Sequence, residues 1–103
     1  MRPLLEYGDL TVTIAADLLI RDSDRRCAAA LLRLAGCRYA RSRDLTPVEV
    51  PLTQNELAGA ANLSRNSVGT MLQRLEKRGF VEVGYGAMTV RVPAALRAFV
   101  DQS

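Results

Sequence analysis

The sequence predicts an α+β fold, with three to four helices around one core and a small antiparallel sheet of two to four short strands. Residues 53–79 hold two short helical patterns joined by a tight turn. Directly after Gly79 the hydrophobic period changes from helical to alternating, which indicates a β-hairpin. This order of elements predicts a winged helix-turn-helix, and the 103 residues are enough for one such domain.

The N-terminal segment predicts a helix of its own. In Asp9–Arg21, the residues Leu10, Ile14 and Leu18 follow one another at steps of four and share one helical face. We expect residues 1–21 to form an N-terminal arm outside a winged-helix domain of residues 22–103.

A second helix is expected to begin at Asp22 or Ser23, either of which can cap it, and to end at Gly36. Its predicted inward-facing residues are Cys27, Ala28, Leu31, Leu32, Leu34 and Ala35. Leu45–Leu52 is then expected to form a short strand that can pair with the hairpin.

The first helix of the helix-turn-helix has a start signal made of two residues. The Thr53 hydroxyl can accept from the backbone N–H three residues on, while the Glu56 carboxylate accepts from the Thr53 N–H, an arrangement known as a capping box. Asn62 stands where the turn requires a left-handed backbone, which Asn tolerates best after Gly. The predicted apolar face consists of Leu57, Ala58 and Ala61.

The second helix, residues 64–79, is the candidate recognition helix. Ser64 is its predicted N-cap, and residues at i, i+3, i+4 and i+7 form its apolar stripe. These residues are Val68, Met71, Leu72 and Leu75. Its other side chains therefore point outward, and they have the chemistry of a surface that reads DNA bases.

Arg can bond guanine bidentately, Asn can bond adenine, and Gly allows close approach to the floor of the major groove. The predicted base contacts are Arg65, Asn66, Gly69 and Thr70, and the predicted phosphate contacts in the later turns are Gln73 and Lys77. The alternative interpretation is an ordinary solvated helix face.

The hairpin is the predicted wing, with its turn at residues 84–86 and apolar residues alternating on both strands. Pro93 is placed in the first turn of a closing helix. The apolar face of that helix is expected to consist of Leu96, Phe99 and Val100.

Charge is distributed unevenly along the chain, whose net charge is +3. Six arginines and no acidic residue lie between Arg25 and Arg43, so this stretch is expected to lie along phosphates. The alternative is that its arginines are solvated helix and loop positions. These six residues are Arg25, Arg26, Arg33, Arg38, Arg41 and Arg43.

Enzymatic activity is not expected, because the chain has no His and no glycine-rich phosphate loop. We also expect no cofactor and no metal, since Cys27 and Cys37 match no ligand spacing. Cys27 is expected to be a small buried thiol. Apolar runs are short and broken by charge, so no membrane span is predicted.

The stretch LTQNELAGAANLSRNSVGTMLQRLEKRGFV resembles the DNA-binding domain of the Crp/Fnr regulators, the cyclic-AMP receptor protein group of bacterial transcription factors. The family pattern is LTxxELA, a turn, and then SRxTVxRxLxxLExxGxI. The resemblance extends over about Asp22–Val100. The matching positions are Leu52, Thr53, Glu56, Leu57, Ala58, Ser64, Arg65, Val68, Leu72, Leu75, Glu76 and Gly79.

The resemblance implies specific roles for several residues. Arg65 and Asn66 would touch bases, and the phosphate contacts would include Thr53, Gln54, Ser64 and Ser67. Many members have Glu in place of Asn66 and Arg in place of Thr70, so the usual family half-site is not expected here. Residues 1–21 would correspond to the end, or remnant, of a dimerisation helix. In the family that helix follows an effector-binding β-roll domain, of which we expect no counterpart in the 103 residues.

The resulting prediction is a sequence-specific regulator of transcription, or its DNA-binding part, that binds double-stranded DNA. We expect a cytoplasmic homodimer, weak in solution, with RNA polymerase as a further partner. The alternative is a winged helix that serves as a protein–protein interaction module, in which Arg65 and its neighbours contact an acidic surface.

Overall fold

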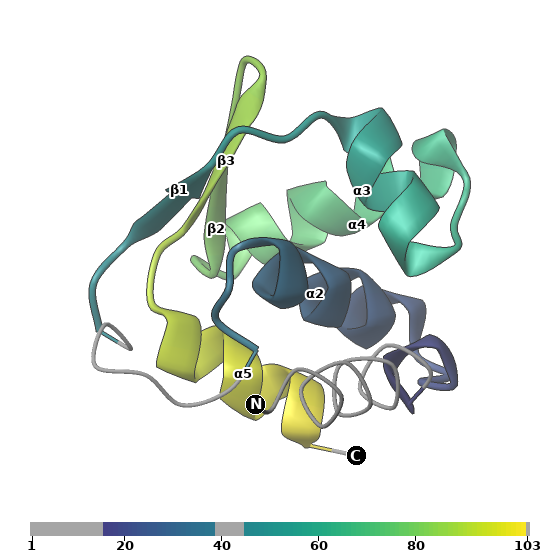
Figure 1. Ribbon diagram of the computed structural model, residues 1–103, viewed down its shortest axis with the longest axis horizontal. Coiled ribbons are helices and arrows are strands. Elements are labelled where there is room, and N and C mark those ends of the chain that lie inside the picture. Colours follow the sequence, from purple (N-terminus) through teal and green to yellow (C-terminus); the bar gives the residue numbers. More distant parts are fainter. Residues whose placement is uncertain (1–15, 39–44, 103) are drawn as a thin grey trace, which may run out of the picture.

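The computed structural model describes residues 16–38 and 45–102 of the chain (Figure 1). Its helices and strands follow the predicted order. They are α2 (Ser23–Leu34), β1 (Val48–Val50), α3 (Gln54–Ala61), α4 (Arg65–Lys77), β2 (Val81–Gly84), β3 (Ala87–Val90) and α5 (Pro93–Asp101). The α+β winged helix-turn-helix prediction is therefore confirmed.

Helix α2 lies at the centre, with α5 on one side and α3 with α4 on the other (Figure 1). Asp22 is its N-cap and accepts from the Asp24 N–H at 3.1 Å. The six residues from Cys27 to Leu32 are all inaccessible to solvent, because helices cover α2 on several sides. The expectation that Leu34 points inward is wrong: this residue is 45% exposed in the last turn, where that cover ends.

The three strands form one antiparallel sheet in the order β1-β3-β2. Val90 of β3 stands opposite Val48 of β1 and Val81 of β2, so the first strand does pair with the wing. That strand is shorter than predicted, at three residues instead of the expected Leu45–Leu52. Pro47 and Pro51 flank it, and a proline has no N–H to donate to a sheet.

The prediction of a helix over Asp9–Arg21 is wrong at its C-terminal end. Of the described residues of this segment, 16–18 are helical, and a turn follows in which the Ile20 N–H donates to the Asp17 carbonyl at 3.2 Å. Two residues of the predicted apolar stripe, Leu10 and Ile14, lie outside the described residues.

The closing helix α5 completes the core as predicted. Pro93 occupies its first turn, and Leu96, Phe99 and Val100 are buried. The Phe99 ring packs against Phe80, with 5.2 Å between the ring centroids. This contact joins α5 to the start of the wing.

Candidate nucleic-acid interface

The start of α3 is fixed by its capping box. The Thr53 N–H donates to the Glu56 carboxylate at 2.8 Å, and the Glu56 N–H donates to the Thr53 hydroxyl at 3.1 Å. Both partners are exposed, and the Thr53 hydroxyl keeps its own proton for an outside acceptor. This geometry is compatible with the predicted contact between Thr53 and a DNA phosphate.

The turn between α3 and α4 depends on one left-handed residue and one distant arginine. Asn62 has φ 57° and ψ 51°, as the sequence predicted. Arg26 of α2 donates to the Ala61 carbonyl at 2.9 Å and to the Asn62 carbonyl at 3.4 Å. Because these carbonyls at the end of α3 have no partner in the helix itself, the arginine holds the turn against α2.

Two serines organise the start of α4. The Ser67 N–H donates to the Ser64 hydroxyl at 3.1 Å, which confirms the predicted N-cap. The Ser64 hydroxyl in turn donates to the Ser67 hydroxyl at 2.9 Å. The Ser64 proton is therefore engaged, while the Ser67 proton is free to meet an acceptor outside the protein.

One polar arc of α4 faces solvent, opposite the buried stripe of four apolar residues that the sequence predicted. Its exposed members are Arg65, Asn66, Thr70, Gln73 and Lys77. Arg74 on one flank pairs with Asp24 of α2 at 2.9 Å, and Glu76 on the other accepts from the Val83 N–H of the wing at 3.1 Å. The orientation of the arc is thus fixed from both sides.

The predicted contact residues lie in two groups, one around the starts of α3 and α4 and one at the end of α4. Gln54 at the start of α3 reaches across to α4, where a Cβ at Gly69 would lie 3.4 Å from its side-chain oxygen. Gly69 thus stays accessible but is partly covered. Lys77 is about 18 Å along the helix from Arg65, at 1.5 Å per residue, so it belongs to a separate end of the surface.

A hollow of about 370 Å³ separates the start of α3 from the wing. Arg65, Thr53 and Gln54 line it, together with two residues that the sequence analysis did not single out as contacts, Asn55 and Tyr85. Tyr85 stands fully exposed at the tip of the hairpin. Its position between two turn glycines was the signal that placed it at this tip.

The arginines of residues 25–38 do not lie free for phosphates, nor are they merely solvated. Arg33 pairs with Asp17 at 2.7 Å, and Arg38 pairs with the same carboxylate at 3.1 Å. Arg25 donates to the Phe99 carbonyl at 2.9 Å and stacks on the Phe99 ring. Both sequence interpretations are therefore wrong for these residues, which join α2 to its neighbours; Arg41 and Arg43 lie outside the described residues.

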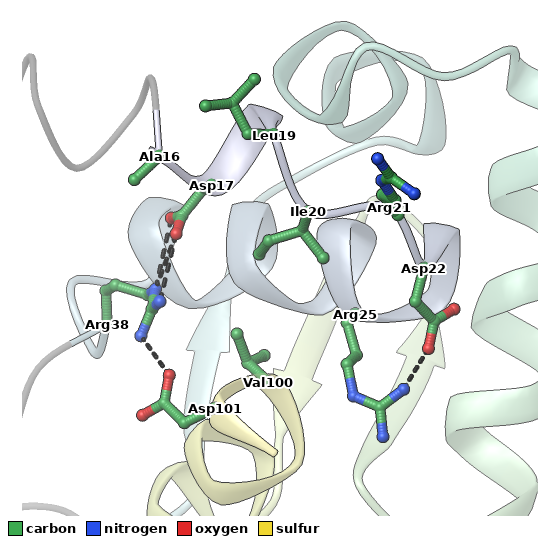
Figure 2. Close-up of a pocket in the computed structure, with 10 residues that line it drawn as sticks. All are labelled: Ala16, Asp17, Leu19, Ile20, Arg21, Asp22, Arg25, Arg38, Val100 and Asp101. Atoms are coloured by element: carbon green, nitrogen blue, oxygen red, sulfur yellow. Dashed lines mark hydrogen bonds and ion pairs between the residues drawn. The ribbon is translucent and has the colours of Figure 1, made fainter. Parts of the chain in front are cut away.

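A second hollow, of about 610 Å³, is lined by residues of α2, of α5 and of the segment before α2, and by no residue of the recognition helix. Figure 2 shows Arg38 between the carboxylates of Asp17 and Asp101. Asp17 is only 2% exposed, and sequence reasoning missed it because its partners stand 16 and 21 residues away. Asp17, Arg38 and Asp101 at this hollow are thus engaged with one another.

Both cysteines are buried and free. Burial raises the pKa of the Cys27 thiol to about 12, and the nearby Asp24 carboxylate adds to the rise. Among residues 16–38 and 45–102, no three His, Cys, Asp or Glu side chains are grouped as a metal site would require. None of the helices in this described part is long and apolar enough to cross a membrane.

Comparisons with known proteins give the same fold. The family model of the Crp-like helix-turn-helix domain matches residues 25–99. A CRP-family transcriptional regulator from Thermus thermophilus is 25% identical, with a TM-score of 0.77. The match covers 99% of this chain and 52% of the regulator's chain. The catabolite activator protein of the same organism is 28% identical, with a TM-score of 0.63 over 95% of this chain and 41% of its own.

A further solved structure, of a CooA mutant from Carboxydothermus hydrogenoformans, is 22% identical, with a TM-score of 0.72 over 95% of this chain and 45% of its own. This likeness supports the fold alone. No curated protein matches the chain by sequence.

The fold and this surface define a winged helix-turn-helix, a class of DNA-binding domain. Within that class, the chain belongs to the family of Crp-like helix-turn-helix domains, the DNA-binding part of CRP/FNR transcriptional regulators. It spans about half of the length of the regulators with which it was compared.

Proposed function

We propose that the protein binds double-stranded DNA sequence-specifically, as a regulator of transcription or as the DNA-binding part of one. Residues 64–79 enter the major groove. The observation that carries the proposal is the polar arc of α4, which is exposed, free of acidic side chains at its centre, and held in place at both flanks. Membership of the Crp-like family supports the same assignment.

The residues of the arc have different roles in this proposal. Arg65 and Asn66 bond base edges. Gly69 allows the helix to approach the groove floor closely, and Thr70 contacts a base there. The phosphates are held by Thr53, Gln54, Ser64, Ser67, Gln73 and Lys77. The hydroxyl geometry favours Ser67 over Ser64 as the donor, because the Ser64 proton is engaged within the cap.

The domain acts as a homodimer on a two-fold-related site in this proposal, because one recognition helix reads only a few base pairs. The association is weak in solution, the location is the cytoplasm, and RNA polymerase is a further partner. No enzymatic activity is proposed.

Selection of bound sequences from a pool of random duplexes tests the proposal most directly. We expect a palindromic consensus, with an affinity that falls steeply as the salt concentration rises, because phosphate contacts release counterions. Lys77→Gln should reduce the salt slope by about one without changing the consensus. Absence of binding to any duplex at low salt would overturn the proposal.

The second candidate function, a protein-interaction module, predicts the opposite result. Its supporting observation is the same exposed, acid-free face, which would contact an acidic protein surface. Retention of an acidic protein with no affinity for duplex DNA at low salt would support it.

A further inference from the structure

We propose that Thr70 reads the 5-methyl group of a thymine with its own methyl group. The inference rests on the proposed function, since it requires α4 to lie in the major groove. It concerns the position at which many members of the family carry Arg, and it assigns a different kind of base recognition to this chain.

The orientation of the Thr70 side chain is the first observation. Its hydroxyl donates to the backbone carbonyl of Asn66, one turn earlier, at 3.3 Å. The bond is long, so its main consequence is the direction of the side chain. With the oxygen held over the helix backbone, the methyl group takes another staggered position on the same carbon and is turned away from that carbonyl.

The second observation is the place of Thr70 on the arc. The residue is exposed and lies opposite the buried stripe, between Asn66 and Gln73, which are one turn away on either side. A side chain this short can reach a base only if the helix backbone approaches closely. The neighbouring Gly69, which has no side chain, allows that approach.

The chemistry of the major groove then selects one base. Thymine alone presents a methyl group there, while the groups that distinguish adenine, guanine and cytosine are hydrogen-bond donors and acceptors. The long bond to the Asn66 carbonyl directs the Thr70 hydroxyl proton toward the helix backbone, and therefore away from an acceptor on guanine or adenine. The methyl group of this exposed residue gains most by excluding water from another methyl group.

The experiment uses a duplex that carries the selected consensus, in which each dT is replaced singly by dU. This replacement removes only the 5-methyl group and keeps the base pair. We expect one position per half-site at which the protein loses affinity about fourfold, the effect of burying one carbon group. Replacement of a dT between the half-sites is the control for altered DNA flexibility.

Two variants identify the group on the protein. Thr70→Val keeps the methyl group and removes the hydroxyl, so it should retain the discrimination between dT and dU. Thr70→Ser keeps the hydroxyl and removes the methyl group, so the discrimination should disappear. Because Thr70 is exposed, both variants should fold like the parent, which thermal unfolding checks.

Three outcomes would overturn the inference. They are equal binding of dT and dU at every position, loss of discrimination in Thr70→Val, and a dU effect that persists in Thr70→Ser. In each case sequence-specific binding itself would still be measured, so the proposed function would stand. Failure to bind any duplex would instead remove both.

Discussion

Arginine has two separate uses in this protein. Arg65 stands exposed at the start of the recognition helix, whereas Arg26 and Arg33 donate to carbonyls at the end of α3. The guanidinium group suits both uses because its five N–H groups can bond several acceptors in one plane. Only the first use leaves the side chain available to a ligand.

Replacement of Arg65 with Ala tests whether that side chain reads a base. Arg65→Ala should weaken binding by roughly 1–3 kcal/mol and relax the preference at one base position per half-site. Gln54→Ala and Ser67→Ala are the comparison, since loss of a phosphate contact should weaken all sequences alike. If Arg65→Ala also weakened all sequences equally, Arg65 would be a phosphate contact.

Asp17 is the buried carboxylate on which two arginines converge. Asp17→Asn removes the charge but keeps the shape, and it removes the ion pair that Asp17 makes with each of two largely buried guanidinium groups, those of Arg33 and Arg38. We expect a loss of roughly 3–5 kcal/mol in the free energy of unfolding, measured with urea. Asp101→Asn, at the exposed side of the same network, should lose no more than about 1 kcal/mol. Equal effects of the two changes would contradict this account.

We expect the free energy of unfolding to fall in alkaline solution, because the buried Cys27 thiol ionises less easily in the folded protein than in the unfolded one. Its pKa in the folded protein, about 12, lies above the ordinary value of 9.0, because burial disfavours the thiolate. The stabilising contribution is therefore complete below pH 9 and is lost as the pH rises toward 12, by up to about 1.4 kcal/mol per pH unit.

The comparison that isolates this effect is with Cys27→Ala, which has no thiol to ionise. We expect the free energy of unfolding, measured with urea from about pH 8 to about pH 11, to decline less in the variant than in the parent. The two proteins differ only in the thiol. Identical pH dependence of the two proteins would show that Cys27 ionises as easily when folded as when unfolded.

At the scale of elements, the sequence was most informative where the signal is local. The capping box, the left-handed Asn62 and the stripe of α4 each depend on residues within a few positions of one another, and all three are confirmed. The prediction for the N-terminal helix was wrong at its C-terminal end, because a pattern of three apolar residues does not exclude a break, and the chain turns after Leu18.

The stripe of α4 also fixes which residues can face DNA. Leu72 is 1% exposed in the middle of that stripe. Leu72→Ala should leave a cavity and lower the free energy of unfolding by roughly 2–5 kcal/mol. The adjacent exposed Gln73→Ala is the matched control and should change stability by less than about 0.5 kcal/mol. Equal stability of the Leu72 variant and the parent would mean that the face assignment is wrong.

At the scale of the whole molecule, the sequence located the candidate site but not the contacts that orient it. Arg26 and Ala61 are 35 residues apart, and Arg25 and Phe99 are 74 apart. Pairings at such separations leave no local pattern, so the arginine run was misinterpreted. The individual DNA contacts and the domain boundary after residue 21 stay predictions.

Assembly is expected to be weak. The surface that we expect to form the dimer is the apolar stripe of Leu10, Ile14 and Leu18 in the N-terminal segment. Leu18 is 38% exposed, and Leu19 beside it is 80% exposed. We expect concentration-dependent dimerisation in sedimentation at micromolar protein, and cooperative binding to a palindromic duplex. Leu18→Asp should abolish the dimer, whereas Leu34→Asp, at another exposed leucine, should not. A tight dimer that persists on dilution and tolerates Leu18→Asp would mean that another surface is used.

The contact between Glu76 and the wing also affects how copies of the chain can meet. Strand β2 is an edge of the sheet, and its outward Val83 N–H is already taken by the Glu76 carboxylate. The opposite edge, β1, has only three residues between two prolines. Another copy therefore finds no long row of free N–H and C=O groups along the described strands with which to extend the sheet. For the described residues, association of copies is therefore expected through helical surfaces, and growth of fibrils by addition to these strands is disfavoured.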